Sequence, residues 1–567
     1  MSFLESVVRH SQRKDMMRGA VICYKQSNRE ITTNVGFGKS LKKDNGDRMT
    51  DHSKLFSAIS SLYSQSREPT LIPKQGNFPF PQMYPGQLTV MQELRDFKEA
   101  ALTSHTGSGK TAVFLGLTRG EPTIIIEPRK FLQKQVQTYY HDYVLFGKSE
   151  YPCKHAKSAA LSACQSRKSC EQTSYHNTCP TATQTCLNKP CKVFQTETGF
   201  ARYPCEGCVY ISAVQGAMKA LQDKKTVICN FGNLWNLLPK AKVVVVDEAD
   251  LFFREISSPT RMYYSSAKHN AEDTIKVLLS REYHGLEGAI KTTRDSKSVY
   301  GLQNKLYTIQ FLSTYSDLCF KYQKKDKIYI EVSPDNVSIL KDKLFKGKRL
   351  LIVSATLGDF NIPQHSYSVW QRRGIFFNPV GKMTSRNLAL QPWLMKNAAD
   401  AIEEISGLAE VKYDTKQFVI HCGNIGTHAT SLNALLGPES CTLHEKGNLM
   451  KTIEDFTSSD KRYLLVASAE YGADFAWCKM QFILKFPYAS LDERMRVLER
   501  TMGKDKFNRF YLNDAITRFI QQCGRNVRGY GDFGVTIVLD SKFVEVYRAN
   551  EKSFPEWFRE GFDGKVY

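Results

Sequence analysis

The sequence predicts an α/β fold built from two parallel sheets, each covered by helices. From Phe78 onward, short apolar runs rich in β-branched residues alternate with longer stretches of helical pattern. Continuous apolar runs are typical of strands buried on both faces, and parallel strands need a connection long enough for a helix. The runs form two groups, before and after about residue 360: TIIIE, TVICN, VVVVD and LLIVS, then FVIHC, YLLVAS, FILKF and GVTIVLD.

Length and composition bound the class of protein. The chain has 567 residues, of which 42% are hydrophobic and 11% aromatic, so it can bury a large core and is not wholly disordered. At about 150 residues per domain, this length predicts three to four domains. No apolar run approaches the ~18 residues of a membrane helix, and the charged N-terminus does not resemble a secretory signal. We therefore expect an intracellular protein in a reducing compartment.

Changes in composition along the sequence predict three regions, the second of which carries two insertions. Residues 1–75 are polar and basic and predict an N-terminal extension whose role the sequence does not reveal. Residues 76–360 predict the first lobe and residues 361–567 the second. Two stretches interrupt the first lobe, a Cys-rich segment at about 140–209 and a polar, Lys- and Tyr-rich segment at about 255–345.

The net charge indicates a polyanionic partner. Lysine and arginine number 78 against 57 acidic residues, which gives +21. Nucleic acid is the first expectation and an anionic membrane the second, although a merely solvated surface would give the same count.

SHTGSGKT, from Ser104 to Thr111, has the pattern of a phosphate-binding loop. Gly107 and Gly109 allow the backbone N–H groups to face a phosphate, and the following helix N-terminus adds its dipole. Lys110 would reach the β- and γ-phosphates, and Thr111 would ligate Mg²⁺. A Gly-rich turn without a ligand is the alternative.

A pair of carboxylates follows the run VVVV, at Asp247 and Glu248. Asp247 at the tip of a strand suits Mg²⁺, and Glu248 suits the orientation or activation of an attacking water. A solvated turn would also end in such residues. The two motifs in this order favour a nucleoside triphosphatase.

The second half supplies groups that could complete the site. GRNVRG follows a helical segment that contains Gln521, and we expect Arg525 and Arg528 to share one helix face. From there they could act as arginine fingers on the γ-phosphate. Asp474, in EYGADF after the run YLLVAS, could face the nucleotide. The hydroxyls of Ser354 and Thr356 could bond the Asp-Glu loop and so link hydrolysis to lobe movement.

Together these motifs resemble those of superfamily 2 helicases, and more narrowly those of the XPD/Rad3/DinG group of iron–sulfur DNA helicases. The resemblance covers about residues 78–250 and 349–545. It includes FPFPQMYPGQ, EPRKFLQKQ, VDEAD, VSATL, AEYGADF, and KFPYASLDERMRVLER followed by AITRFIQQCGRNVRGYGDFGVTIVLDSKF. It implies two RecA-like lobes with an Fe–S insertion and a small arch-like insertion in the first lobe.

The resemblance also implies site residues. Catalytic roles fall on Lys110, Asp247, Glu248, Gln521, Arg525 and Arg528. Nucleotide contacts fall on Gln87, in the adenine-sensing position, and on Thr106, Gly107, Ser108, Gly109, Lys110, Thr111 and Asp474. The sequence departs from the family at Asp250, where a histidine is usual. Turnover of ATP should survive this change, whereas coupling between the lobes is in question.

Eight of the 15 cysteines lie between Cys153 and Cys208, and in a reducing compartment such clustering favours a metal over disulfides. The resemblance implies a [4Fe–4S] cluster held by Cys153, Cys191, Cys205 and Cys208, with Cys186 in reserve. Cys205 and Cys208 form a C-x-x-C pair, a spacing that lets two thiolates meet one metal. Structural zinc and free thiols are the alternatives.

These patterns predict an ATP- and Mg²⁺-dependent DNA helicase or translocase that unwinds forked or tailed duplexes. The resemblance implies 5′ to 3′ movement on single-stranded DNA. The expected partners are DNA and no membrane, with protein partners open and a monomer compatible with the sequence. The alternatives are a DEAD-box-like RNA helicase, a zinc-stabilised nucleic-acid-binding protein with weak ATPase, and a motor with added nuclease activity.

Overall fold

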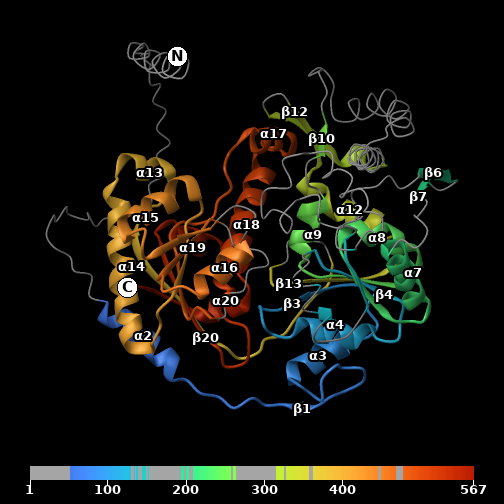
Figure 1. The fold of residues 1–567 in the computed structure, drawn as a ribbon, viewed down its shortest axis with the longest axis horizontal. Helices are drawn as coiled ribbons and strands as arrows, with labels where there is room; N and C mark the ends of the chain where they lie inside the picture. Colours follow the sequence, from blue (N-terminus) through green and yellow to red (C-terminus); the bar gives the residue numbers. More distant parts are fainter. Residues whose placement is uncertain are drawn as a thin grey trace, which may run out of the picture. The chain divides into compact units, whose positions relative to one another are not determined.

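Two seven-stranded parallel sheets form the framework of the chain (Figure 1). The structure is a computed structural model that describes residues 52–128, 133, 136–137, 143–147, 151, 193–196, 199–202, 209–256, 260–262, 314–324, 327–356, 362–444, 449–467, 475 and 477–567. These residues belong to one compact unit, His52–Tyr567. None of the helices within these ranges is both long and apolar enough to cross a membrane.

The first sheet has the strand order β14-β3-β13-β9-β4-β8-β5, and each of its pairs is parallel. Four of its strands are the apolar runs that the sequence predicted, and β4, β8 and β9 are buried at every residue. The strands are β3 (Glu99–Thr103), β4 (Thr123–Ile126), β5 (Tyr143–Leu145), β8 (Thr226–Cys229), β9 (Val243–Val246), β13 (Arg349–Ser354) and β14 (Gln364–Ser366).

Helices cover both faces of the first sheet, which explains why its strands lack polar alternation. One face packs mainly against α3 and α4, and the other against α7, α8, α9 and α12. The bounds are α3 (Pro85–Glu93), α4 (Lys110–Thr118), α7 (Val209–Gln222), α8 (Phe231–Leu237), α9 (Ala249–Ile256) and α12 (Val337–Leu344).

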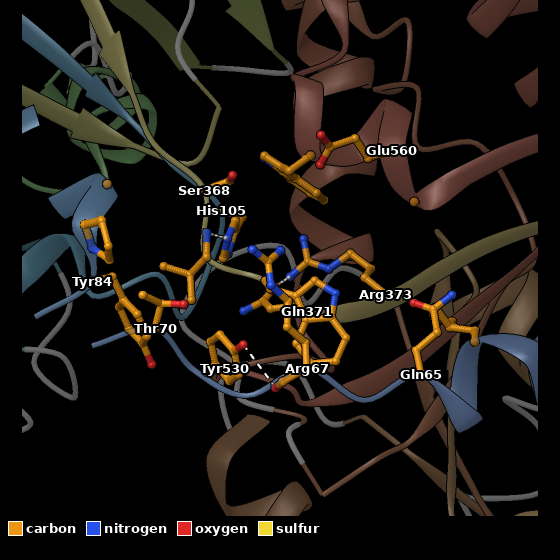
Figure 2. A pocket seen from close by; sticks show the side chains of 17 residues that line it. Gln65, Arg67, Thr70, Tyr84, His105, Ser368, Gln371, Arg373, Tyr530 and Glu560 are labelled. Atoms are coloured by element: carbon orange, nitrogen blue, oxygen red, sulfur yellow. Dashed lines mark hydrogen bonds between the residues drawn. The ribbon is translucent and has the colours of Figure 1, made fainter. Parts of the chain in front are cut away.

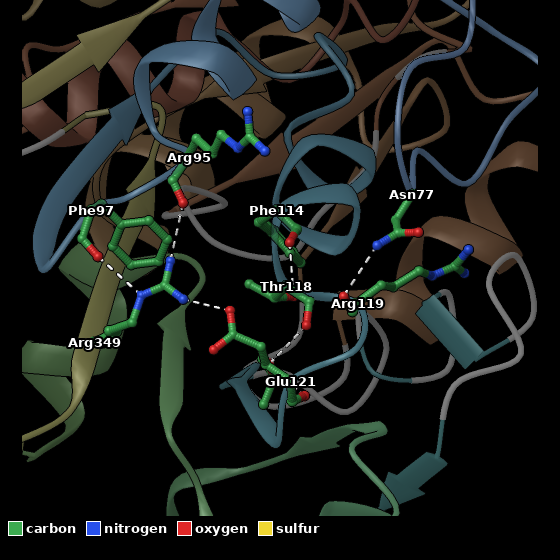
Figure 3. A network of polar contacts seen from close by, with 9 residues as sticks. Asn77, Arg95, Phe97, Phe114, Thr118, Arg119, Glu121 and Arg349 are labelled. Atoms are coloured by element: carbon green, nitrogen blue, oxygen red, sulfur yellow. Dashed lines mark hydrogen bonds and ion pairs between the residues drawn. The ribbon is translucent and has the colours of Figure 1, made fainter.

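Arg349 ties together three segments at the edge where the first-sheet strands begin (Figure 3). Its Nε donates to the carbonyl of Phe97 at 3.0 Å, and its guanidinium lies 4.5 Å from the centre of the Phe97 ring. The same guanidinium pairs with Glu121 and donates to the carbonyl of Arg95. This network fixes the starts of β3, β4 and β13 relative to one another.

The second sheet has the order β17-β18-β16-β19-β20-β15-β21, again with parallel pairs throughout. The predicted runs form β16, β18, β19 and β20. The strands are β15 (Arg372–Gly381), β16 (Phe418–His421), β17 (Cys441–Leu443), β18 (Tyr463–Val466), β19 (Met480–Ile483), β20 (Phe533–Asp540) and β21 (Phe562–Val566). The fold class predicted from the sequence, two helix-covered parallel sheets, is confirmed.

The long helix α14 packs on the sheet of the second lobe, and the pair α17 and α18 shares an apolar cluster with residues of the arch-like segment. The bounds are α13 (Ser385–Leu390), α14 (Trp393–Tyr413), α15 (Thr430–Leu436), α16 (Leu449–Thr457), α17 (Glu493–Met502), α18 (Lys504–Cys523), α19 (Lys542–Asn550) and α20 (Glu556–Gly561).

Two small antiparallel sheets lie within the segments predicted as insertions. The strands β6 (Val193–Thr196) and β7 (Gly199–Arg202) form a hairpin in the Cys-rich segment. The strands β10 (Thr260–Met262), β12 (Lys327–Val332) and β11 (Cys319–Lys324) form a three-stranded sheet in the arch-like segment. Aromatic residues of β11 pack against α17 and α18 in a shared apolar cluster.

The N-terminal extension contributes a helix that the sequence analysis did not identify. Helix α2 (Ser53–Ser64) buries Leu55, Phe56 and Ile59 in the core of the second lobe. Further along, β1 (Ile72–Pro73) pairs with β2 (Gln82–Met83), next to the first lobe.

Candidate nucleotide site between the lobes

The predicted phosphate loop connects β3 to α4, so that Lys110 is the first residue of the helix. Gly107 and Gly109 have φ values of 80° and 82°, a region that glycine enters without a steric penalty. An added Cβ at Gly109 would lie 2.6 Å from Nε2 of Gln87, and one at Gly107 would lie 1.7 Å from the carbonyl oxygen of Arg528. Both positions therefore require glycine.

Lys110 turns back onto its own loop. Its Nζ donates to the carbonyls of Ser104 at 2.9 Å and His105 at 3.1 Å. Burial lowers the pKa of Lys110, and the nearby charges of Glu248 and Asp247 oppose this shift. The ammonium of Lys110 and the two carboxylates are therefore close enough to interact electrostatically.

Gln87 shapes the loop with both ends of its side chain. Oε1 accepts from the backbone N–H of Tyr84 at 2.9 Å, and Nε2 donates to the carbonyl of Ser108 at 3.1 Å. The side chain is 3% exposed. Gln87 thus lies beside the loop, where it fixes the start of α3 against the turn at Ser108.

His105 holds the loop to the linker between the lobes. Its Nε2 accepts from the N–H of Val369 at 3.0 Å, and its Nδ1 lies 3.0 Å from the carbonyl of Thr106, which requires Nδ1 to donate. Burial and the charge of Arg373 lower the pKa of His105 to about 3, so the ring is neutral at pH 7. Gln371 adds a bond from its Nε2 to the carbonyl of Thr106 at 3.1 Å.

Asp247 and Glu248 lie just past the end of β9, as predicted. The carboxylate of Asp247 accepts from the N–H of Glu248 at 2.9 Å, and Glu248 has a φ of 46°. A positive φ in a residue other than glycine is uncommon and is found often at functional sites. Burial, and then the charge of Glu248, raises the pKa of Asp247, whereas Lys110 opposes the shift.

Sequence analysis missed Glu127. This residue follows β4, the strand next to β9 in the sheet, and it is 1% exposed. A hydrogen bond with Glu127 also lowers the pKa of Asp247. The signal was present in TIIIE, because an acidic residue directly after a buried parallel strand lies at the edge where the other strand ends converge.

Asp250 is bonded to the strand-end motif of the first lobe. The Oγ of Ser354 donates to Oδ1 of Asp250 at 2.7 Å and also accepts from the N–H of Thr356 at 3.2 Å. The expected link to the Asp-Glu segment is present for the hydroxyl of Ser354, whereas the hydroxyl of Thr356 accepts from Gln521 instead. A carboxylate here accepts from Ser354, so the aspartate that replaces the family's usual histidine still has a partner.

The second lobe meets this motif through Gln521. Its Nε2 donates to Oγ1 of Thr356 at 2.8 Å, and its Oε1 accepts from Nη2 of Arg525 at 3.1 Å. Gln521, Arg525 and Thr356 are all buried. A chain of side-chain hydrogen bonds therefore runs from the first lobe to the first of the two predicted arginine fingers.

The expectation that Arg525 and Arg528 share a helix face is wrong. Helix α18 ends at Cys523, and both arginines follow in a turn after Gly524. Glycine disfavours continuation of a helix, which is the local reason for the stop. The turn is held by Asp532, whose Oδ2 accepts from the N–H of Arg528 at 2.9 Å.

The turn gives the two arginines different neighbours. The charge of Arg528 contributes to the lowered pKa of Lys110, which indicates that Arg528 lies near the phosphate loop. The charge of Arg525 contributes to the lowered pKa of His421, at the end of β16. Arg528 thus borders the loop, whereas Arg525 lies deeper, beside Gln521.

The remaining predicted residues divide into two groups. Thr106, Ser108 and Thr111 lie on the loop and the first turn of α4, and Ser108 is fully buried. Asp474 lies outside the residues that the structure describes. So do the expected ligands of the cluster, which are Cys153, Cys191, Cys205 and Cys208, with Cys186 in reserve. Among the described residues, no group of three or more His, Cys, Asp or Glu side chains could hold a metal ion.

Comparison with known proteins connects this site to a family. Residues 428–561 match the family model of the helicase C-terminal domain. The 3′-5′ exonuclease DinG of Staphylococcus saprophyticus is 25% identical over 256 residues, which cover 41% of this chain and 28% of that protein. The chain resembles the XPD/DinG group of superfamily 2 helicases. The resemblance expected from the motifs is thereby confirmed.

Solved structures of XPD/DinG-like proteins are similar as well. An XPD helicase matches with a TM-score of 0.48 and 12% identity, over 82% of this chain and 97% of that one. Xpd4 of S. tokodaii matches with a TM-score of 0.49 and 12% identity, over 85% of this chain and 99% of that one. In sequence, the chain aligns with little more than a quarter of the length of the S. saprophyticus relative.

Proposed function

We propose that this XPD/DinG-like chain is an ATP-dependent DNA helicase or translocase. The observation that carries the proposal is the hydrogen bond between Gln521 and Thr356. It joins the lobe that holds the phosphate loop to the lobe that holds Arg525 and Arg528. A change at the nucleotide can therefore alter how the lobes contact each other, which is the requirement for a motor.

The chemical roles follow from the positions of the side chains. Asp247 and Thr111 would hold Mg²⁺, which would neutralise phosphate charge and keep Asp247 ionised despite its burial. The donor set fits a hard cation, because it consists of carboxylate and hydroxyl oxygens, with Glu127 as a further buried carboxyl. Glu248 would orient the attacking water.

The cationic side chains would stabilise the transferred phosphoryl group. Lys110 now donates to two loop carbonyls, and the same ammonium would donate to the β- and γ-phosphates when a nucleotide binds. Arg528 borders the loop and would neutralise the developing charge. Arg525, held by Gln521, would report the state of the site to the second lobe.

The proposed substrate track is single-stranded DNA, followed 5′ to 3′. The charge of +21 supports a phosphate backbone as the partner, and binding should weaken steeply as salt increases. DNA is favoured over RNA because KFPYASLDERMRVLER and the Cys-rich segment resemble the DNA helicases of this group. Asp250 favours RNA instead, because it makes residues 247–250 read Asp-Glu-Ala-Asp, the pattern of DEAD-box RNA helicases.

We also propose a [4Fe–4S] cluster on Cys153, Cys191, Cys205 and Cys208. The hairpin register supports this choice, since Val193 pairs with Arg202, two residues after Cys191 and three residues before Cys205. Iron and sulfide analysis of anaerobically purified protein tests it. About four irons and four sulfides per chain are expected. Zinc without iron would mean that the cysteines hold a structural zinc ion instead of the cluster.

The decisive experiment measures ATP-dependent unwinding of 5′-tailed and 3′-tailed DNA duplexes and of matched RNA duplexes, with Lys110→Ala as control. We expect unwinding of the 5′-tailed DNA duplex and of neither the 3′-tailed DNA duplex nor the RNA duplexes. Unwinding of RNA alone would identify an RNA helicase. Shortening of the labelled strand without ATP would reveal a nuclease, as the name of the S. saprophyticus relative suggests.

A further inference from the structure

The second lobe includes a helix that precedes the first lobe in the sequence. Helix α2 buries its apolar face in the core of the second lobe. Its last turn is held there as well. The ring of Tyr63 packs at 5.0 Å from that of Phe533, and Nη1 of Arg372 donates to the carbonyl of Tyr63 at 2.7 Å. Within His52–Tyr567 the chain therefore begins in the second lobe, forms the first lobe and then returns to the second.

The chain thus crosses between the lobes twice. Residues 65–71, here called the strap, run from α2 to β1, and in Figure 1 they form a nearly straight segment along the lower edge of the view. Residues 367–371, here called the linker, run from β14 of the first sheet to β15 of the second. Fully extended chains of these lengths span at most about 25 Å and about 18 Å, so both connections are short.

The strap is anchored at both ends. At its far end it continues into Ile72, which pairs with Met83, a residue buried in the core beside α3. Near its start the hydroxyl of Tyr530, in the second lobe, donates to the carbonyl of Arg67 at 3.1 Å. Each end of the strap therefore moves with its own lobe.

The linker crosses the boundary between the lobes over a very short distance. The N–H of Val369 donates to Nε2 of His105 in the first lobe at 3.0 Å. The carbonyl of the next residue, Trp370, accepts from the N–H of Gly531 in the second lobe at 3.0 Å. Because His105 directly precedes Thr106 of the phosphate loop, this crossing lies beside the loop.

The strap and the linker are adjacent but separate. Residues of both line one cavity of about 750 Å³ (Figure 2). Tyr530 connects them, because its hydroxyl binds Arg67 of the strap and its ring lies 5.4 Å from that of Trp370 in the linker. The same ring stacks on Tyr84 of the first lobe, with centres 5.7 Å apart and an angle of 12°. The lobes therefore touch each other at this point.

Two crossings restrict the relative movement of two bodies more than one crossing does. Bodies joined at a single point can rotate against each other about three axes. When they are joined at two points, only the rotation about the line through both points remains. Short, anchored connections approach this limit, whereas long flexible ones do not.

We propose that the strap is the second strand of a two-stranded hinge. The hinge lets the lobes open and close about the line through the strap and the linker, and it restricts the twisting of one lobe against the other. On closing, this rotation returns Gln521 to Thr356 and the carbonyl of Arg528 to Gly107. The strap lies outside all the helicase motifs, and the hinge does not depend on the proposed function.

The test lengthens the strap without cutting the chain. About twelve Gly and Ser residues inserted after Glu68 make the connection flexible, and lengthening an exposed segment costs little stability. The same insertion after Gly46, which precedes α2 in the sequence, is the matched control. Azide-bearing amino acids at Asp223 and Glu439, exposed positions on the first and the second lobe, carry the dyes for single-molecule energy transfer.

The width of the inter-lobe distance distribution is the first readout. Without nucleotide, the lengthened strap should broaden this distribution by about half or more relative to the control insertion. A distribution of unchanged width would overturn the proposal. If the insertion prevents folding, a protease site in place of residues 66–70 allows the strap to be cut after folding, and the cut protein should show the same broadening.

The second readout is the coupling of hydrolysis to movement. With the lengthened strap, the number of ATP molecules hydrolysed per base pair unwound should rise about threefold or more, while turnover without DNA stays within about twofold. An unchanged ratio would show that the strap does not guide the lobes. If the control protein neither hydrolyses ATP nor unwinds DNA, the proposed function fails, and the distance distribution alone decides whether the hinge exists.

Discussion

Nε2 of Gln521 donates to Oγ1 of Thr356 at 2.8 Å, across 165 residues of sequence and from one lobe to the other. The side-chain amide of Gln521 is held in this orientation by Arg525, whose Nη2 donates to Oε1 of Gln521 at 3.1 Å. The acceptor lies two residues from Ser354, which bonds Asp250. Five residues, from Asp250 to Arg525, thus form a single path between the carboxylate end and the arginine end of the site.

The first prediction concerns this path. Thr356→Val keeps the shape of the side chain and removes the hydroxyl, which leaves the buried amide of Gln521 without its acceptor. DNA-stimulated kcat should fall by roughly tenfold, since one hydrogen bond of this kind contributes about 1 kcal/mol or more. The KM for ATP should change little. Thr501→Val, which removes an exposed hydroxyl on α17, is the matched control.

The second prediction concerns the phosphate loop. Lys110→Ala removes the ammonium that Asp247 and Glu248 face, and ATP turnover should fall by roughly 10²- to 10³-fold, as for other losses of one charged donor. Single-stranded DNA binding without nucleotide, measured by fluorescence anisotropy, should stay within about twofold. Retained turnover would mean that hydrolysis occurs elsewhere.

The third prediction compares two ion pairs between the three-stranded sheet β10-β12-β11 and the start of α17. Arg494 on α17 donates from Nε to both oxygens of Glu331 on β12, at 2.9 and 2.8 Å, and Glu331 is 1% exposed. Lys324 and Asp492 pair at 2.9 Å but are 53% and 36% exposed. Arg494→Met should cost roughly 3 kcal/mol of unfolding free energy, because it strands a buried carboxylate. Lys324→Met should cost less than about 1 kcal/mol.

Urea unfolding of both variants measures the contrast. The double variant Glu331→Gln with Arg494→Met should recover part of the loss, because no unpaired charge remains buried. Equal effects of Arg494→Met and Lys324→Met would show that burial of Glu331 does not decide the strength of this contact between the insertion and the second lobe.

The fourth prediction concerns acid stability. His421 is fully buried; its Nε2 donates to Oε1 of Gln481 at 3.1 Å, and its Nδ1 has no partner among the described residues. Burial lowers the pKa of His421 to about 4 from 6.5. The unfolded chain therefore takes up the proton first, and stability falls as pH decreases from 6.5 toward 4, by about 3 kcal/mol from this residue.

The pH profile of urea unfolding checks this sign. His421→Gln should lower stability at pH 7.5 but flatten the decline between pH 6.5 and 4. His444, a partly buried histidine of the same lobe, supplies the matched control as His444→Gln. A decline that is equally steep in His421→Gln would assign the acid sensitivity to other groups.

The sequence alone determined the local features of this protein. The apolar runs became β4, β8, β9 and β13 in one sheet and β16, β18, β19 and β20 in the other. Such runs identify strands because burial on both faces excludes polar residues. The phosphate loop and the Asp247-Glu248 pair were equally readable, since neighbouring residues and backbone conformation define them.

The helix end at Cys523 shows where local reading failed. The spacing of Arg525 and Arg528 suited a helix, but Gly524 and the bonds of Asp532 to the next turn ended it. The Gly107 position shows the opposite case. The sequence predicted a glycine here because the loop backbone must face a phosphate. The fold adds a second reason, because the carbonyl of Arg528 leaves no room for a Cβ at this position.

Only the tertiary structure decided which distant residues meet. The bond from Gln521 to Thr356, the buried Glu127 beside Asp247 and the docking of α2 on the second lobe each depend on packing between elements far apart in the chain. Sequence periodicity records burial along one element, but a side-chain hydrogen bond depends on how two elements are placed against each other. That placement is a property of the whole core, so no local pattern of residues encodes it.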